Sequence, residues 1–305
     1  MNSLYRGWNF FIQALDIARK DPDLIKPSII GFFVNILVTI VFFIPAVLVF
    51  FLAGGAGAFL GEWSGQLILV IFSAGFTLLQ YIISYLFAGM TCYLVYQYVT
   101  QGDGKMGDAW KVVQRDFLDL LMLAFTSTLV SIVENFIRSQ GRRAGGIANV
   151  IAGLVASILE TVWTVATYFV LPAMVIEDLH LGNALKRATH IIKGNLLLVT
   201  VSEIGVKGII NILSTVLVFI AIGISVGAFS LFGSLLSTAG FIIGGIIAML
   251  VFGLVIAFTT VFGSYITTAY YTMMYIWALE AEQAMAHGQP ANSVTAPVAI
   301  QAALA

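Results

Sequence analysis

The chain has 305 residues, of which 60% are hydrophobic and only 10% are charged, whereas soluble domains carry about 25% charged residues. The formal net charge is −1, which gives no reason to expect a nucleic-acid partner. The single cysteine excludes a disulfide framework and a thiolate metal site as organising features. We therefore expect a membrane protein without a cofactor.

Six apolar segments are each long enough to cross about 30 Å of hydrocarbon as a helix. Residues 208–279 contain no Asp, Glu, Lys or Arg, and Glu62 is the only charged residue in 27–102. In chain order the segments are 28–52, 67–98, 117–137, 147–175, 206–232 and 241–279. They predict an all-α, polytopic transmembrane helical bundle.

The basic residues lie mostly on one side of the predicted bundle. Ten of them precede the first segment or connect segments two to three and four to five, whereas three connect segments three to four. This distribution predicts an inner (plasma) membrane protein with both termini in the cytoplasm. Because the exceptions are Arg138, Arg142 and Arg143, a re-entrant hairpin stays open as an alternative for segments three and four.

An amphipathic helix is predicted before each pair of segments, starting near residues 3, 106 and 183. Leu4, Trp8 and Phe11, for example, recur at helical spacing before the first segment. We expect three cytoplasmic-side interfacial helices and one transmembrane domain, 1–280, with possible modules 3–102, 103–180 and 181–280. Basic linkers in any six-span protein would give a similar pattern, so internal duplication stays open. Residues 281–305 are expected to form a disordered tail.

Cations on these amphipathic helices are predicted to contact lipid head groups. They are Lys20, Lys111, Lys186, Arg187 and Lys193. Aromatic side chains late in the sixth segment are expected to anchor that helix at the membrane interface. They include Tyr270, Tyr271 and Tyr275.

The fourth segment carries Glu160 near its centre, with Ser157 and Thr164 about one turn away on either side. A polar face with a carboxylate at that depth is not expected to face lipid. Ser131 and Thr260 belong to similar stripes on the third and sixth segments. These five residues are predicted to line a pathway in which Glu160 titrates or coordinates. A carboxyl group that only hydrogen-bonds a neighbouring helix explains the pattern equally well.

Two further pairs of opposite charge occur at i, i+4 spacing near segment ends. They are Glu134 with Arg138, and Glu203 with Lys207. We expect both to be structural charge pairs near the interface.

Signatures of catalysis are missing from the sequence. The three histidines, His180, His190 and His287, have no metal-ligand spacing. A GxxxxGK phosphate loop is also absent. We therefore expect a protein that is not an enzyme.

Residues 169–195 read FVLPAMVIEDLHLGNALKRATHIIKGN, in which a Pro-containing apolar run precedes an acidic pair, a glycine and an Ala-Leu-Lys-Arg helix. The helix that begins Gly107-Asp108-Ala109-Trp110 has a similar spacing. The pattern resembles uncharacterised prokaryotic six-span membrane families of the domain-of-unknown-function type. It also resembles, more distantly, the membrane domain attached to some glycerophosphodiester phosphodiesterases. The resemblance implies a fold, and it carries over no substrate and no catalytic residue.

The sequence favours channel- or transporter-like passage of a small solute or ion. The alternative is a non-catalytic scaffold or accessory subunit of a membrane complex. That scaffold would bind anionic lipid or partner proteins, either further copies of the chain or other membrane subunits.

Overall fold

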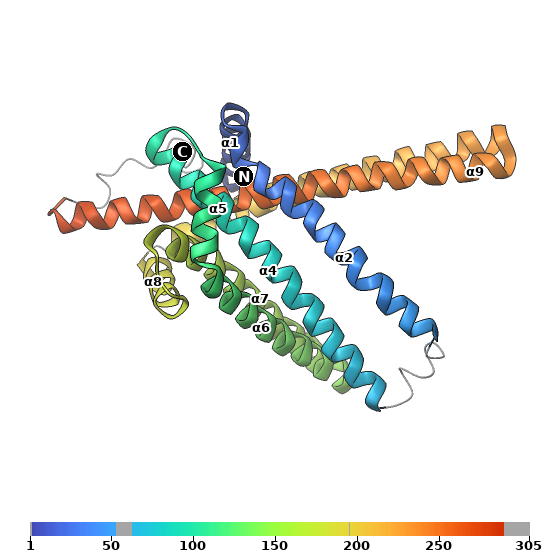
Figure 1. The fold of residues 1–305 in the computed structure, drawn as a ribbon, viewed down its shortest axis with the longest axis horizontal. Helices are drawn as coiled ribbons and strands as arrows, with labels where there is room; N and C mark the ends of the chain where they lie inside the picture. The colour runs from blue at the N-terminus through green and yellow to red at the C-terminus, as the bar shows by residue number, and fades with distance from the viewer. Residues whose placement is uncertain (1, 53–62, 195, 290–305) are drawn as a thin grey trace. The chain divides into compact units, whose positions relative to one another are not determined.

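The computed structural model describes residues 2–52, 63–194 and 196–289, and these ranges contain helices and no strand (Figure 1). Within those ranges, six helical stretches are long and apolar enough to cross a membrane. This confirms the predicted fold class and number of spans, and the chain is a multi-pass membrane protein. It divides into two compact units, Met1–Ser28 with Gly194–Ala305, and Ile29–Lys193.

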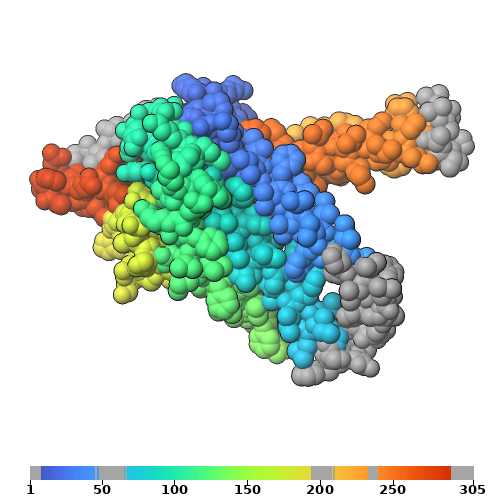
Figure 2. All heavy atoms as spheres, in the orientation of Figure 1, coloured from blue at the N-terminus to red at the C-terminus, as the bar shows by residue number. Residues whose placement is uncertain are grey.

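In the first unit, α9 (Leu196–Ala286) doubles back on itself, as Figures 1 and 2 show. A Cβ added at Gly244 would lie 3.2 Å from Cα of Phe229, and one added at Gly263 would lie 3.5 Å from Cγ2 of Ile210. The later residue of one arm, Gly263, contacts the earlier residue of the other, Ile210. The two arms therefore run antiparallel. Each arm contains one of the six apolar spans.

The N-terminal helix α1 (Asn2–Lys20) packs on α9 within this unit. Phe10 is fully buried, and its ring packs edge-to-face with the ring of Tyr270 with the centroids 4.8 Å apart. The hydroxyl of Tyr265 donates to the backbone oxygen of Ala14 at 3.1 Å. The prediction that the late tyrosines of α9 anchor it among lipid head groups is wrong, because α1 packs there and their rings belong to a protein core.

α9 remains helical as far as Ala286. The expected disordered tail therefore does not begin at residue 281. Residues 290–305, which make up most of that prediction, lie outside the described residues.

The second unit begins within α2 (Lys26–Leu52), which follows a short 3-10 turn, η1 (Pro22–Leu24). Aromatic rings join α2 to α4 (Trp63–Gln101). The centroid of Phe42 lies 4.3 Å from that of Phe72, on the facing helix. This contact pairs the first two apolar spans.

Next along the chain, α5 (Met106–Arg115) buries Ala109 and Val113 and contacts α4. Then α6 (Phe117–Ala144) and α7 (Gly146–Glu177) form a hairpin that packs on α4 (Figure 1). At 1.5 Å per residue these two helices are about 42 and 48 Å long. Their length favours full crossing over the re-entrant alternative, since the hydrocarbon core is about 30 Å thick.

Glycines allow α6 and α7 to pack closely against each other in their hairpin. Its turn is formed by Gly145 and Gly146, with φ of +68° and +50°, a region that glycine adopts without a steric penalty. A Cβ added at Gly141 would lie only 2.4 Å from Cβ of Ala152. The two helix backbones therefore approach one another as closely as glycine allows.

The element order repeats as the predicted modules require. The amphipathic helices α1, α5 and α8 (Leu181–Gly194) each precede a pair of apolar spans. The packing does not follow the module boundaries, because α1 of the first module contacts α9 of the third. Their origin by internal duplication stays a prediction.

Candidate functional site

An ion pair joins α6 to α7 near the middle of α7. Nη2 of Arg138 lies 2.8 Å from Oε2 of Glu160, and the same nitrogen donates to Oγ of Ser157 at 3.3 Å. Glu160 is separated from each end of the helix by about 20 Å or more of helical rise. Glu160 thus lies well inside a membrane-length helix, whereas Arg138 is about 9 Å of helical rise from the end of α6.

The direction of the side chains explains why Arg138 meets Glu160. Side chains on an α-helix lean toward its N-terminus. Arg138 on α6 therefore leans away from the hairpin turn, while Glu160 on the antiparallel α7 leans toward it. Among the described residues the predicted pairing of Arg138 with Glu134 is replaced by this contact, and Glu134 remains an electrostatic neighbour of both charges.

Deeper in the same interface, one serine connects three helices. Oγ of Ser127 on α6 lies 2.7 Å from the hydroxyl of Tyr85 on α4 and accepts a 3.0 Å hydrogen bond from the indole nitrogen of Trp163 on α7. Ser127 is fully buried. A single hydroxyl can serve both partners because its oxygen has two lone pairs and one proton.

Tyr81 lies between the Arg138–Glu160 ion pair and the hydrogen bonds of Ser127. It interacts with Ser131 on α6, lies within electrostatic range of Glu134 and Glu160, and stacks on Tyr85 with the ring centroids 5.8 Å apart. We call the whole set the polar seam: Tyr81, Tyr85, Ser127, Ser131, Glu134, Arg138, Ser157, Glu160 and Trp163. Along α6 the seam covers about 17 Å of helical rise. This is roughly half the thickness of the hydrocarbon core.

The polar seam is closed at one end and open at the other. Ser127 is 0% exposed, whereas the side chains of Arg138 and Glu160 are 34% and 58% exposed. Ionised groups that face lipid are disfavoured by about 3 kcal/mol each. The open end is therefore suited to contact with water, a solute or another protein.

The structure brings together three of the five predicted pathway residues, Glu160, Ser157 and Ser131. Thr164 is half-buried one turn further along α7, where its carbonyl oxygen accepts the hydroxyl of Thr167. Thr260 is an exposed residue of α9 in the other unit, and its place on a pathway stays a prediction.

Glu203 and Lys207 were the second predicted charge pair. Their side chains lie outside the described residues, and the pair stays a prediction.

Sequence reasoning missed Tyr81, Tyr85 and Trp163, which supply the α4 side and the closed end of the seam. A signal was present, because the two tyrosines lie one turn apart in the middle of an apolar span. Hydroxyl groups at such a depth need partners on another helix.

Three of the five cations predicted to contact lipid head groups already have carboxylate partners. Lys20 pairs with Asp16 at 2.7 Å, Lys111 with Asp108 at 3.1 Å, and Arg187 with Glu177 at 3.0 Å. Lys186 and Lys193 are exposed and form no ion pair in the part of the chain that the structure describes.

A second polar cluster fixes the start of α8. Oδ1 of Asp119 accepts the backbone N–H of Leu181 at 3.2 Å, and Oδ2 lies 2.9 Å from Nδ1 of His180. The hydrogen bond to Asp119 and its charge raise the pKa of His180 above the usual 6.5. Nearby, Arg115 contacts Asp178 at 3.2 Å. The α5–α6 junction therefore holds the α7–α8 junction.

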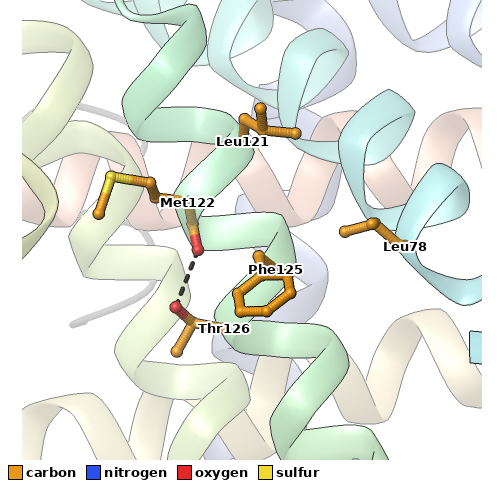
Figure 3. Close-up of a pocket in the computed structure, with 5 residues that line it drawn as sticks. All are labelled: Leu78, Leu121, Met122, Phe125 and Thr126. Carbon is orange, nitrogen blue, oxygen red and sulfur yellow. Dashed lines mark hydrogen bonds between the residues drawn. The ribbon is translucent and has the colours of Figure 1, made fainter. Parts of the chain in front are cut away.

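An apolar hollow of about 400 Å³ lies between α4 and α6. Figure 3 shows its lining residues Leu78, Leu121, Met122, Phe125 and Thr126. The hydroxyl of Thr126 donates to the carbonyl oxygen of Met122 within α6 at 2.8 Å. An ion or polar solute would find little to bind there.

Within the described ranges, no group of three or more His, Cys, Asp or Glu residues is placed to hold a metal ion. No family model and no curated protein matches this chain. The resemblance of residues 169–195 to six-span families of unknown function and to phosphodiesterase membrane domains therefore stays a prediction.

Proposed function

We propose that this chain is a channel- or transporter-like protein that passes a small solute or ion along the polar seam. It would act in the inner membrane with both termini in the cytoplasm. The observation that carries the proposal is the half-exposed carboxylate of Glu160, which is paired with Arg138 and lies in the middle of a membrane-length helix. Ionisable groups at such a depth commonly mark ion or substrate pathways.

The chemistry of the seam suits transient binding. A cation would compete with Arg138 for the carboxylate of Glu160, and an anion would compete with Glu160 for the guanidinium. The hydroxyls of Tyr81 and Ser131 offer the next polar contacts along the interface. Such sites bind strongly enough to admit a solute and weakly enough to release it.

The buried end of the seam would act as the gate. Tyr85, Ser127 and Trp163 hold α4, α6 and α7 together there, so passage requires these hydrogen bonds to open. No bond of the solute is made or broken in this scheme. We accordingly propose a protein that is not an enzyme.

Flux through proteoliposomes tests the proposal. Purified full-length protein would be reconstituted, and passage of protons, Na⁺, K⁺ and glycerol would be followed with indicator dyes and by swelling. We expect at least one probe to pass faster than in empty liposomes, and the Glu160→Gln variant to lower that flux about tenfold or more. Glu280→Gln, an exposed carboxyl near the end of α9, should leave the flux unchanged.

The same half-exposed ion pair also supports a second candidate, a scaffold or accessory subunit. In that case another membrane subunit, or another copy of the chain, would cover Arg138 and Glu160. Wild-type protein would then pass none of the four probes, and Ser157→Cys would cross-link to the covering chain in membranes. That result would replace the passage proposal.

A further inference from the structure

We infer that α8 carries a binding site for the phosphate group of an anionic phospholipid, formed by Lys186, His190 and Lys193. These side chains line a hollow of about 390 Å³ together with Leu185 and Thr189. The site is separate from the polar seam. The inference of a lipid site does not depend on whether the chain passes a solute.

The three nitrogen-bearing side chains share one face of α8. Their spacing of four and then three residues places them one above another along the helix. The opposite face is apolar and buried, through Leu181, Ala184, Ala188 and Ile191. The hollow is therefore on the side of α8 that remains available to a ligand.

The charges on this face are available to an anion. Lys186 and Lys193 form no ion pair among the described residues, in contrast to Lys20, Lys111 and Arg187. Hydrogen bonds from an ammonium to a phosphate are roughly twice as strong as neutral ones. His190 lines the hollow between the two lysines.

The helix is also fixed before any ligand binds. The carboxylate of Asp119 accepts the first backbone N–H of α8, and Arg187 binds Glu177 at the end of α7. Because these contacts hold the helix, the lysines need little rearrangement to meet a phosphate. Preorganisation of this kind lowers the entropic cost of binding.

A phospholipid suits the hollow better than free phosphate does. The lining combines the apolar side chain of Leu185 and the methylene stems of two lysines with the nitrogen donors. Lysine side chains of this kind lie along apolar surface while their charge reaches a head group. Lipid is also at hand, because the chain has six apolar spans.

Lipid retention by the full-length protein tests this site. The protein in neutral detergent would be titrated with phosphatidylglycerol, and bound lipid would be counted by native mass spectrometry. Each lysine near a lipid phosphate is worth about fivefold in affinity, so Lys186→Gln with Lys193→Gln should weaken binding about thirtyfold. The matched control Lys111→Gln removes a lysine that is already paired and should leave affinity within about twofold.

Further experiments distinguish lipid from free phosphate as the ligand, and loss of charge from a change in folding. Lys186→Arg with Lys193→Arg keeps both charges and should retain binding. Inorganic phosphate and neutral phosphatidylcholine should not displace phosphatidylglycerol at equal concentration. Wild-type affinity in the glutamine variant would overturn the site, and displacement by inorganic phosphate would overturn the assignment to lipid.

Discussion

Replacing Gly141 by alanine tests the close approach of α6 and α7 that shapes the polar seam. The added Cβ would lie 2.4 Å from Cβ of Ala152. Carbon atoms in contact are normally about 3.5–4.0 Å apart, so the helices must separate locally by about 1 Å. Overpacking of this kind costs about 1–3 kcal/mol. The contact between Arg138 and Ser157, already 3.3 Å long, would then exceed hydrogen-bonding distance.

Gly153→Ala is the matched control for this variant. Gly153 is also helical, and a Cβ added there has nothing within 4 Å. Both substitutions gain the same helix propensity, up to about 1 kcal/mol, so their difference isolates the steric contact. We expect Gly141→Ala to unfold at a lower temperature than Gly153→Ala when tryptophan fluorescence of the full-length protein is followed in detergent.

A compensating change strengthens the test. Ala152→Gly removes the atom that Gly141→Ala would strike, so the two changes together should be more stable than their separate effects predict. The reasoning is refuted when Gly141→Ala unfolds at or above the temperature of Gly153→Ala. It is also refuted when the two substitutions combine additively.

Two other polar contacts give predictions of known direction. Ser127→Ala removes the hydrogen bonds that Ser127 forms with the half-buried hydroxyl of Tyr85 and the indole of Trp163, and should lower the free energy of unfolding by about 1–3 kcal/mol. An unchanged unfolding temperature would contradict this. For His180, nuclear magnetic resonance should give a pKa above 6.5 that falls when Asp119 becomes Asn. The contact then stabilises the fold fully below pH 6.5 and less as the pH rises through the raised pKa. A His180 pKa that is unaffected by Asp119→Asn would rule this out.

Much of the fold follows from the sequence because charge is so costly in a membrane. Residues 208–279 contain no ionised side chain, and the structure places two apolar spans there. Helical spacing likewise placed Glu134 and Arg138 on one face of α6. Both predictions depend on the hydropathy or the helical spacing of a single segment, and the residues of that segment are enough to determine either property.

The partners across the seam could not be obtained in the same way. The sequence offered Glu134 as the nearest partner of Arg138, whereas α7 supplies Glu160. Tyr85 and Trp163 gained their role only when α4 and α7 came together at Ser127. Such contacts depend on the register between helices, and spacing within one helix contains no information about that register.

The sequence by itself determined the solvent, the six spans and the presence of polar groups within them. These features follow from the free energy of moving each side chain between water and hydrocarbon, and that quantity is additive along the chain. Only the tertiary structure decided that α1 covers the tyrosines of α9, and that the polar seam is buried at Ser127 and open at Glu160. These outcomes depend on the direction in which each side chain leans and on how closely two backbones approach.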